Sequence, residues 1–479
     1  MTPRALCSLA AGCAVLSAGC SADKLGAPNG GSFAGGSAAL PKLRPASSSP
    51  SQYLSHVVII VQENRSFENF FAGYPNANAP MTGCAIPVGS REPRRFARAF
   101  RPGTGSGSGC PPGDVSIALQ KITFKGPDLA HNYGAATHDY DNGKMDGFSK
   151  FGNMGPYEAY SYVDPSLLGP YWTMAQRYVL ADAMFPTEFG GSFTGHLTLV
   201  AGNDAIDQSP SRSEVDFPNG AYDDCDSPPG TRSSYLTANG QEHFYGGPYP
   251  CFDQFNSIAN VLDRGGVSWK YYASKQLDDG MWEPFEAFKY TRYGRDWSNI
   301  VAPQSRVLTD PGTGALASVD WVTPSKDDSD HPHYRSDQGP SWVASVVNAV
   351  GESRYWPTTA IVVLWDDWGG WYDNAVPPQL DYRGLGVRVP CLIISPYAKT
   401  NYVSHVQYEY GSVLHFIEEV YGLGPIGPAS QGYTDTRAAS LDDAFDFTQN
   451  PRPFSPIPTK YPIEHFLHEP ASNDPIDTE

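Results

Sequence analysis

Runs of apolar, β-branched residues that end in polar clusters recur along this chain. Residues 57–61 form the first run and lead into the polar patch 62–66. Residues 359–365 form a second run and lead into Asp366 and Asp367. Continuous apolar runs of this length are typical of strands in a parallel sheet, which helices cover on both faces. The pattern therefore predicts an α/β fold.

The same reading predicts further elements and two long loops. Gly- and Pro-rich stretches at 75–115 and 205–255 are predicted to be surface loops, the second one a rim or lid of the functional site. Residues 275–320 show no clear period. The predicted elements are helices at 255–264 and 410–422, strands at 267–272 and 389–395, and a helix that runs into a short strand at 171–183.

The composition limits the function classes that remain. The 479 residues include 48 Gly and 43 Pro, and only 18% are charged, which favours a loop-rich protein around a large core. The net charge of −18 argues against nucleic-acid binding, which usually leaves a basic footprint. An acidic surface still admits a phosphorylated substrate, because a bound metal ion can invert the local field.

The N-terminus is typical of an exported protein, which would be periplasmic, anchored in the outer membrane or secreted. Arg4 precedes an apolar run at 5–18 that is too short to span a membrane. Residues 16–20 resemble a bacterial lipoprotein processing box with Cys20 as the lipidated residue, and ordinary signal peptidase cleavage is the alternative. The predicted organisation is a signal peptide at 1–20, a flexible tether at 21–50 and a single domain at 51–479.

Cysteine usage favours an oxidising compartment. Cys84 and Cys110 lie in one Gly/Pro-rich loop, and Cys225 and Cys251 lie in another, so we predict one disulfide bond in each loop. Cys391 lies in an apolar strand and is interpreted as a buried free thiol. None of these spacings suits a zinc site.

Oxygen-bearing side chains follow both long apolar strands. Glu63 and Asn64 follow the first strand, and Asp366 and Asp367 follow the second. Paired carboxylates beside a buried strand are costly unless they are neutralised, and a divalent metal ion is the simplest partner. The alternative at the first strand is a solvated turn into a helix, with Asn64 or Ser66 as its N-cap.

A further polar site is predicted at a turn that enters a helix. Gly190 and Gly191 precede Ser192, and an apolar run follows at 197–201. A serine at the start of a helix lies near free N–H groups that favour an anion, so Ser192 is a candidate nucleophile for a phosphoryl group. An N-cap role for Ser192 is the alternative. If the helix begins at Ser192, His196 lies on the same face.

These segments together resemble one family, the bacterial phosphoesterases that include non-haemolytic phospholipase C and a respiratory-burst-inhibiting acid phosphatase. The match is collinear over residues 52–450, and agreement across several segments is more specific than any single motif. The matching segments are ENRSF (63–67), KMDGF (144–148), GGSF (190–193), DHP (330–332), WDDWGG (365–370), VRVP (387–390) with IISPY (393–397), and SVL (412–414).

The resemblance implies an alkaline-phosphatase-like fold, which is a three-layer α/β sandwich with a mostly parallel central sheet and long surface loops. It also implies one divalent metal ion held by Glu63, Asn64, Ser192, Asp366 and Asp367. Because these ligands are all oxygen donors, Ca²⁺, Mg²⁺ or Mn²⁺ is expected rather than Zn²⁺.

The resemblance further implies which residues handle the substrate. Ser192 is the expected nucleophile and forms a phosphoserine intermediate, and Asn64 also contacts the substrate phosphate. His131 and His331 fall where the family has catalytic, phosphate-contacting histidines, and His331 is expected to protonate the leaving group. Lys270 stands where phosphatase relatives have histidines on the middle strand and is expected to contact the phosphate as a point charge.

Two departures from the family pattern concern the substrate. Residues 190–192 read Gly-Gly-Ser where Gly-Pro-Thr or Gly-Pro-Ser is usual. Residues 409–412 read Glu-Tyr-Gly-Ser where many phospholipases have Asp-His-Thr-Ser. These changes leave the expected metal ligands in place and affect the neighbourhood of the substrate.

The first functional hypothesis is metal-dependent hydrolysis of phosphoric esters, of the phospholipase C type, on phospholipids. An acid phosphatase-type phosphomonoesterase that acts on small phosphate esters is the alternative. A surface lipoprotein that binds phosphorylated ligands without turnover is an alternative from a different class. No nucleic-acid partner is expected, and membrane contact is expected only through a lipid anchor on Cys20 and through the substrate.

Overall fold

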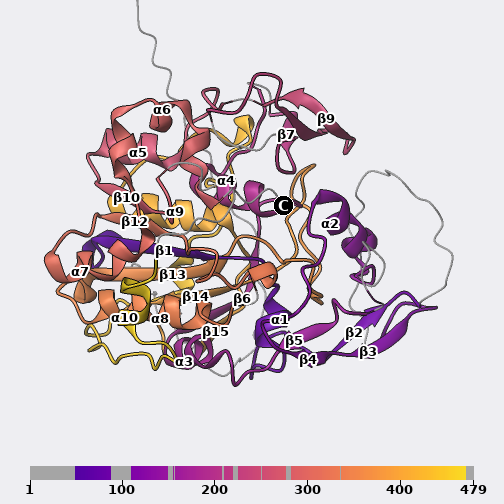
Figure 1. The fold of residues 1–479 in the computed structure, drawn as a ribbon, viewed down its shortest axis with the longest axis horizontal. Helices are drawn as coiled ribbons and strands as arrows, with labels where there is room; N and C mark the ends of the chain where they lie inside the picture. Colours follow the sequence, from indigo (N-terminus) through magenta and orange to yellow (C-terminus); the bar gives the residue numbers. More distant parts are fainter. Residues whose placement is uncertain are drawn as a thin grey trace, which may run out of the picture. The chain divides into compact units, whose positions relative to one another are not determined.

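A central sheet of nine strands organises the fold (Figure 1). The described residues belong to one compact unit of the computed structural model. The predicted signal peptide and residues 21–48 of the predicted tether lie outside the described residues. The structure describes residues 49–87, 109–148, 155, 157–207, 210–219, 225–249, 251–276, 282–334 and 336–470.

The nine strands of the central sheet are mostly parallel, as predicted. They are β1 (His56–Gln62), β6 (Val179–Phe185), β10 (Trp269–Tyr272), β11 (Ile300–Val301), β12 (Val319–Val322), β13 (Thr359–Trp365), β14 (Val389–Ile394), β15 (Tyr402–Ser404) and β16 (Tyr408–Glu409). The order across the sheet is β11-β10-β12-β1-β13-β14-β6-β15, and β16 also pairs with β6. Only β14 runs antiparallel to its neighbours, β13 and β6.

Strand β1 lies inside the sheet, between β12 and β13, because its side chains are apolar on both faces. Residues 57–61 are buried, as the continuous apolar run predicts. β1 pairs in parallel with β13, and Gln62 lies opposite Trp365. The two strands therefore end at the same edge of the sheet, which is where ligands bind in open α/β folds.

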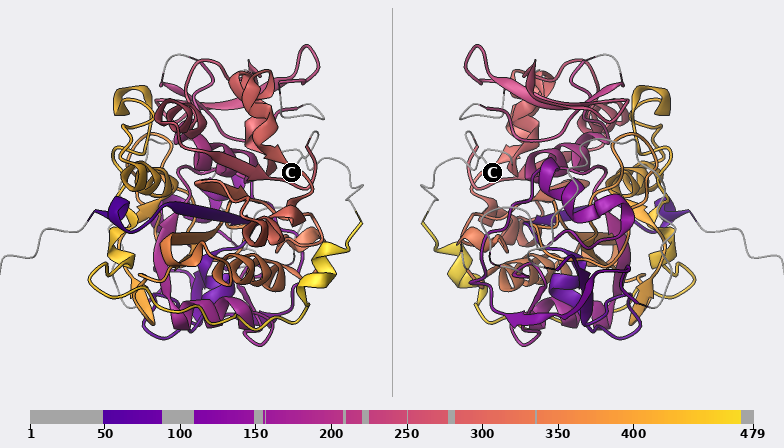
Figure 2. Two further views of the ribbon diagram at one scale, coloured as in Figure 1. Left: turned by 90° about the vertical axis from the view of Figure 1, so that its left-hand side faces the viewer. Right: turned by 90° about the vertical axis from the view of Figure 1, so that its right-hand side faces the viewer.

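Helices cover both faces of the sheet, which gives the predicted three-layer arrangement (Figures 1 and 2). One layer contains α4 (Ser192–Ala201), α5 (Ile258–Gly265) and α9 (Tyr410–Tyr421), and α4 contacts both of the others. The opposite layer contains α3 (Gly169–Arg177), α8 (Gly339–Gly351) and α10 (Ile463–Leu467), and α8 contacts both of the others. The other helices are α1 (Phe67–Phe71), α2 (Tyr133–Tyr140), α6 (Lys289–Arg292) and α7 (Asp310–Thr313).

Three small sheets lie outside the central one. The stretch 205–255, predicted to be a loop, contains a three-stranded antiparallel sheet and is therefore more regular than its Gly and Pro content indicates. The strands of these sheets are β2 (Thr82–Ala85) with β3 (Val115–Ala118), β4 (Gln120–Ile122) with β5 (Ser161–Val163), and β7 (Arg212–Glu214), β8 (Arg232–Thr237) and β9 (Glu242–Pro248).

Both predicted disulfide bonds are present. Cys84 bonds to Cys110, and Cys225 bonds to Cys251. Each bond closes a loop of sequence separation 26, within the stretches that the sequence marked as rich in Gly and Pro. Cys391 is a buried free thiol, as predicted.

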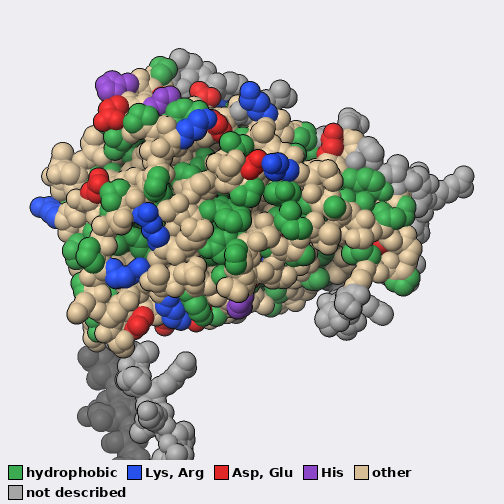
Figure 3. Space-filling view, turned by 90° about the horizontal axis from the view of Figure 1, so that it is seen from below, with side chains coloured by type: hydrophobic (Ala, Val, Ile, Leu, Met, Phe, Trp, Pro, Cys, Tyr) green, Lys and Arg blue, Asp and Glu red, His purple; other side chains and the backbone are tan. Residues whose placement is uncertain are grey.

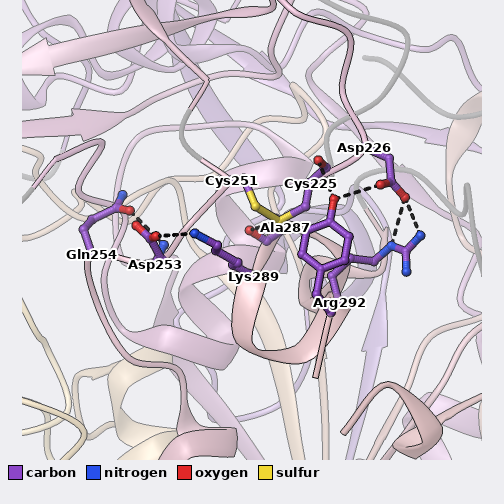
Figure 4. The surroundings of a disulfide bond; sticks show 9 residues. Cys225, Asp226, Cys251, Asp253, Gln254, Ala287, Lys289 and Arg292 are labelled. Carbon is purple, nitrogen blue, oxygen red and sulfur yellow. Dashed lines mark hydrogen bonds and ion pairs between the residues drawn. A yellow bond between two sulfur atoms is a disulfide. The ribbon is translucent and has the colours of Figure 1, made fainter. Parts of the chain in front are cut away.

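The Cys225–Cys251 loop is fixed on helix α6 by charged side chains on both sides of the disulfide bond (Figure 4). Arg292 donates from Nε to Oδ2 of Asp226 at 2.9 Å. Lys289 donates from Nζ to Oδ2 of Asp253 at 3.0 Å. The two ion pairs therefore join the start of this loop and the segment just after it to α6, while the disulfide bond holds the two ends of the loop together.

The hydrophobic pattern alone missed two elements. Strand β12 has only four residues and carries Asp320 in its middle, so no alternation or long apolar run marks it. Helix α8 is buried on nearly every side, so its apolar residues do not fall into the one-sided spacing that identifies surface helices. Both elements are specified by what packs around them.

The described surface has few charged side chains. On the face in Figure 3, charged side chains are scattered among apolar and uncharged ones, in line with the 18% charged residues of the chain. Within the described ranges, no helix has the length and apolar character needed to cross a membrane.

Candidate active site

The polar segment after β1 turns sharply because Asn64 adopts a left-handed backbone conformation, with φ of 58°. Asparagine tolerates this region better than most residues do. The turn buries the side chains of Glu63 and Asn64 completely. The backbone N–H of Asn64 donates to Oδ1 of Asp366 at 2.8 Å, which joins the ends of β1 and β13.

The turn after β13 brings both acidic residues against β1. Asp366 and Asp367 are fully buried, and the N–H of Gly369 donates to Oδ1 of Asp367 at 2.6 Å. Gly369 has φ of 61°, and a Cβ there would lie 2.1 Å from the carbonyl oxygen of Asn64. Only glycine permits this approach, so the sequence Asp-Asp-Trp-Gly is a geometric requirement of the site.

Ser192 is the first residue of helix α4 and faces the acidic pair. Its Oγ donates to Oδ2 of Asp367 at 2.9 Å, and Oδ1 of Asn64 lies 3.4 Å away. The N-cap of α4 is Gly191, so the alternative that Ser192 is an N-cap is wrong. The N-cap alternative holds instead for Ser66, whose side chain accepts from the N–H of Asn69 at the start of α1.

His196 is a member of the site that the sequence did not assign. Its Nε2 lies 2.9 Å from Oε1 of Glu63 and 3.9 Å from Oδ2 of Asp366. The spacing of Ser192 and His196 was the signal in the sequence that could have assigned it, because α4 begins at Ser192 and residues four apart share a helix face. The approach of α4 depends on Gly195, where a Cβ would lie 2.4 Å from the carbonyl oxygen of Asp366.

His131 reaches the site from the loop before α2. Its Nδ1 lies 2.6 Å from the carbonyl oxygen of Leu129, so Nδ1 carries the proton in the neutral ring. Its Nε2 lies 2.9 Å from Nδ2 of Asn64 and therefore accepts from that amide. Gly370 has φ of 72°, and a Cβ there would lie 2.7 Å from the carbonyl oxygen of Ala130, so this glycine admits the histidine loop.

His331 faces His131 across the site. The two ring centroids are 6.0 Å apart, and the indole of Trp282 stacks on His331 with a centroid distance of 6.2 Å. The N–H of His333 donates to Nδ1 of His331 at 3.2 Å. In the neutral ring the proton of His331 is therefore on Nε2.

The loop that carries His331 is fixed to the end of β1. Gln62 accepts from the N–H of Asp330 at 2.9 Å and donates to the carbonyl oxygen of Asp328 at 3.2 Å. Nε of Arg65 donates to the carbonyl oxygen of Asp330 at 2.9 Å. These bonds give Gln62 and Arg65 a positioning role that the motif alone did not reveal.

The structure does not bring Lys270 to this cluster. In the sheet Lys270 lies opposite Asp320, and Asp320 lies opposite Val58, so Lys270 is at the level of the first half of β1. At about 3.3 Å per residue this is roughly 13 Å from the end of the strand. Nζ of Lys270 instead donates to Oδ2 of Asp310 at 2.8 Å. The expected phosphate contact is corrected because register, rather than neighbouring sequence, sets the height of a residue in a sheet.

The electrostatics of the site favour a bound cation. Burial, and then the charge of Asp366, raises the pKa of Asp367 well above its usual range. Burial lowers the pKa of His196 to about 4, which keeps its imidazole neutral and able to bind a metal ion. Oδ2 of Asp366 accepts no hydrogen bond from any residue that the structure describes. The chemistry of these buried donors therefore fits one divalent metal ion.

Comparison with known proteins agrees with this geometry. The model of the phosphoesterase family matches residues 54–424. Non-hemolytic phospholipase C of Pseudomonas aeruginosa is 22% identical over 448 residues, covering 85% of this chain and 59% of the relative. Phospholipase C B of Mycobacterium tuberculosis is 22% identical over 472 residues, covering 84% of this chain and 80% of the relative.

Among solved structures, a Vibrio parahaemolyticus protein in the alkaline phosphatase superfamily is similar at 13% identity and a TM-score of 0.32. The likeness covers 54% of this chain and 61% of that chain. The family match extends over most of the chain and confirms the predicted class of enzyme, a hydrolase of phosphoric ester bonds. The chain belongs to the phosphoesterase family.

Proposed function

We propose that this chain is a phospholipase C-type enzyme that cleaves phosphodiesters of phospholipids through a phosphoserine intermediate. The observation that carries the proposal is the hydrogen bond between Oγ of Ser192 and Oδ2 of Asp367, inside a buried cluster of acidic and amide oxygens. A hydroxyl at a helix start, bonded to a buried carboxylate, has the surroundings of an activated nucleophile.

The metal ion would be held by the residues that end β1 and β13 and begin α4. Glu63, Asn64, Ser192, Asp366 and Asp367 supply the expected oxygen donors. When bound, the ion would supply charge stabilisation for the phosphoryl oxygens and lower the pKa of the serine hydroxyl. Side chains of the protein carry out the attack and the proton transfers.

The first step breaks the ester bond. Oγ of Ser192 attacks phosphorus, and its proton passes to Oδ2 of Asp367, to which the hydroxyl already donates. The bond between phosphorus and the diacylglycerol oxygen breaks. For this step His331 would carry a second proton on Nδ1, in place of its hydrogen bond from the N–H of His333. The imidazolium gives its Nε2 proton to the leaving oxygen and becomes a neutral ring, so diacylglycerol leaves as a neutral alcohol. Asn64 and a His131 protonated on Nε2 would contact the phosphoryl oxygens, in place of the hydrogen bond that joins the two side chains without substrate.

The second step releases the phosphorylated head group. Nε2 of His331, now without its proton, takes a proton from a water molecule that attacks the phosphoserine phosphorus. The bond from phosphorus to Oγ of Ser192 breaks, and Asp367 returns the proton to Oγ. Each residue recovers its starting protonation state, so the cycle is balanced.

The phospholipid substrate is proposed because the relatives named above are phospholipases C. This chain spans 59% of the length of the first of them, so its substrate is not taken over as established. The alternative function, a phosphomonoesterase, would use the same site residues. The two are separated by the product: diacylglycerol from phosphatidylcholine vesicles in one case, and inorganic phosphate from a phosphomonoester in the other.

The test uses the full chain with Mn²⁺ or Ca²⁺ and paired p-nitrophenyl phosphodiester and phosphomonoester substrates. We expect Ser192→Ala to abolish turnover, and acid quenching of the wild-type reaction to trap phosphoserine at residue 192, seen by mass spectrometry. A Ser161→Ala variant, whose hydroxyl bonds to the carbonyl of Glu158 in another part of the fold, serves as the control. Full activity of Ser192→Ala would overturn the phosphoserine mechanism, and a wild type that hydrolyses neither substrate would favour the binding-only alternative.

We also propose that the protein is exported. The two disulfide bonds are typical of oxidising compartments, and the N-terminal sequence is typical of a signal with Cys20 as a lipid attachment site. Metabolic labelling with a radioactive fatty acid tests the anchor, and loss of label in Cys20→Ala is the expected outcome.

A further inference from the structure

The cluster at the end of β1 contains a nitrogen donor in addition to its oxygen donors. Within the described residues, Glu63, His196 and Asp366 each offer one ligand atom, and these atoms lie within 4.8 Å of one another. All three side chains are buried. The family resemblance gave only oxygen ligands, so His196 changes the chemistry expected of this site.

The distances suit direct coordination. Bonds of about 2.0–2.3 Å from a metal ion to nitrogen and oxygen ligands place neighbouring donors about 3–4 Å apart. Nε2 of His196 lies 2.9 Å from Oε1 of Glu63 and 3.9 Å from Oδ2 of Asp366. An ion could therefore bind among these three atoms after shifts of a few tenths of an ångström.

The fold holds His196 in this position. Every residue of α4 is buried, so the imidazole has no solvent-exposed orientation to occupy. Gly195 lets the helix backbone approach the carbonyl oxygen of Asp366, where a Cβ would be 2.4 Å away. Ser192 and His196 then face the acidic residues one helical turn apart, the first toward Asp367 and the second toward Glu63.

We propose that Nε2 of His196 is a direct ligand of the metal ion, together with Glu63 and Asp366. We further propose that this nitrogen makes the site select borderline ions such as Zn²⁺ over Ca²⁺, Mg²⁺ and Mn²⁺. Imidazole suits Zn²⁺, whereas oxygen ligands suit Ca²⁺, Mg²⁺ and Mn²⁺. The inference rests on the proposed metal-dependent function and names the class of ion that this function uses.

The competing role for His196 is to orient Glu63 by a hydrogen bond without touching the ion. An orienting residue contributes to the binding of every ion that Glu63 holds, by about 10–100-fold, as is common for groups that hydrogen-bond to a metal ligand. A nitrogen ligand contributes selectively to borderline ions. The ratio of affinities therefore separates the two roles.

The experiment measures dissociation constants of Zn²⁺, Mn²⁺ and Ca²⁺ for the metal-stripped full chain by competition with a chelating dye. The variants are His196→Gln and, as a matched control, His131→Gln, which removes the neighbouring imidazole of the site. Glutamine at 196 keeps an N–H donor for Glu63, so an orienting role is largely retained. Circular dichroism and thermal unfolding in chelator check that each variant folds.

We expect His196→Gln to weaken the binding of Zn²⁺ at least tenfold and the binding of Mn²⁺ and Ca²⁺ less than threefold. We expect His131→Gln to leave the ratio of affinities unchanged. Equal losses for all three ions, or no loss, would overturn the inference. X-ray absorption of the Zn²⁺-loaded wild type gives a second readout, and we expect an imidazole scattering signal that His196→Gln loses and His131→Gln keeps. A wild-type spectrum without imidazole would overturn the inference even if no variant folds.

The outcome is independent of the hydrolysis assay. If the wild type hydrolyses phosphate esters but binds Zn²⁺ and Ca²⁺ through oxygen alone, the inference about His196 fails and the proposed function stands. If ion selectivity depends on His196 but no ester is hydrolysed with any ion, the proposed function fails and the metal ligand is established.

Discussion

Asp366 and Asp367 are adjacent, buried carboxylates, and their charge and hydrogen bonds determine how the other residues of the site are arranged. Asp367 meets Ser192 through Oδ2 and Gly369 through Oδ1, while Asp366 meets Asn64 through Oδ1. Each hydrogen bond offsets part of the cost of burial, and the remaining negative charge requires a cation.

Replacing Asp367 by Asn should separate catalysis from stability. We expect Asp367→Asn to lower phosphodiester turnover by about 10²–10⁴-fold, because the proposed proton acceptor of Ser192 is lost. In chelator the same variant should unfold at a higher temperature than the wild type, since one of two adjacent buried acids is removed. Calorimetry in EDTA checks this, with Ser192→Ala as the control. A lower unfolding temperature for Asp367→Asn would contradict the account.

The buried carboxyl group of Asp320, which lies away from the site, is expected to make the free energy of unfolding depend on pH. Burial raises its pKa to about 7 in the folded chain, compared with about 3.9 in an unfolded one. Between these values the folded protein holds a proton that the unfolded chain has lost, so the free energy of unfolding falls as the pH rises through this window. Below it both states are protonated, and the effect is absent.

We therefore expect Asp320→Asn to be more stable than the wild type by about 1–3 kcal/mol at pH 8 and nearly equal to it at pH 4. Urea unfolding at several pH values measures the difference. Asp253→Asn, at a carboxylate of the outer loop whose partner is Lys289, is the control and should show no such trend. A constant difference between Asp320→Asn and wild type at all pH values would show that ionisation of Asp320 is not the cause.

At the scale of elements, β1, β13 and α4 position the site, and the sequence predicted all three. The continuous apolar runs of β1 and β13 specify buried parallel strands, and the acidic and amide residues follow directly. Helix α4 was anticipated from the glycines before Ser192. Strand β12 was missed, because four residues with a central Asp320 carry no periodic signal.

The packing of α4 on the end of β13 can be tested through one glycine. We expect Gly195→Ala to destabilise the protein by about 1–3 kcal/mol and to weaken metal binding, because its Cβ would lie 2.4 Å from the carbonyl oxygen of Asp366 and push the helix away. Gly312→Ala in α7 is the matched control, since a Cβ there meets nothing within 4 Å. Thermal unfolding and dye competition report both effects. Equal behaviour of the two variants would refute the packing argument.

At the scale of the whole molecule, metal binding and folding are coupled. The cluster of Glu63, Asp366 and Asp367 draws residues from distant parts of the chain and exists only in the folded state. An ion that binds this state alone stabilises it by about 2.7 kcal/mol at 100 times its dissociation constant. We expect chelation to lower the unfolding temperature of the wild type, and to have little effect on Asp366→Asn. An unfolding temperature that is insensitive to chelator in the wild type would contradict a metal site.

The amino-acid sequence by itself determined the buried strands, the two disulfide pairs and the acidic and amide clusters that follow the strands. These features depend on local runs of residue types, and local patterns are read directly from a chain. Only the tertiary structure decided that Lys270 pairs with Asp310 and that His196 faces Glu63. Strand register and helix packing set these contacts, and both depend on residues far apart in the chain, which no local pattern records.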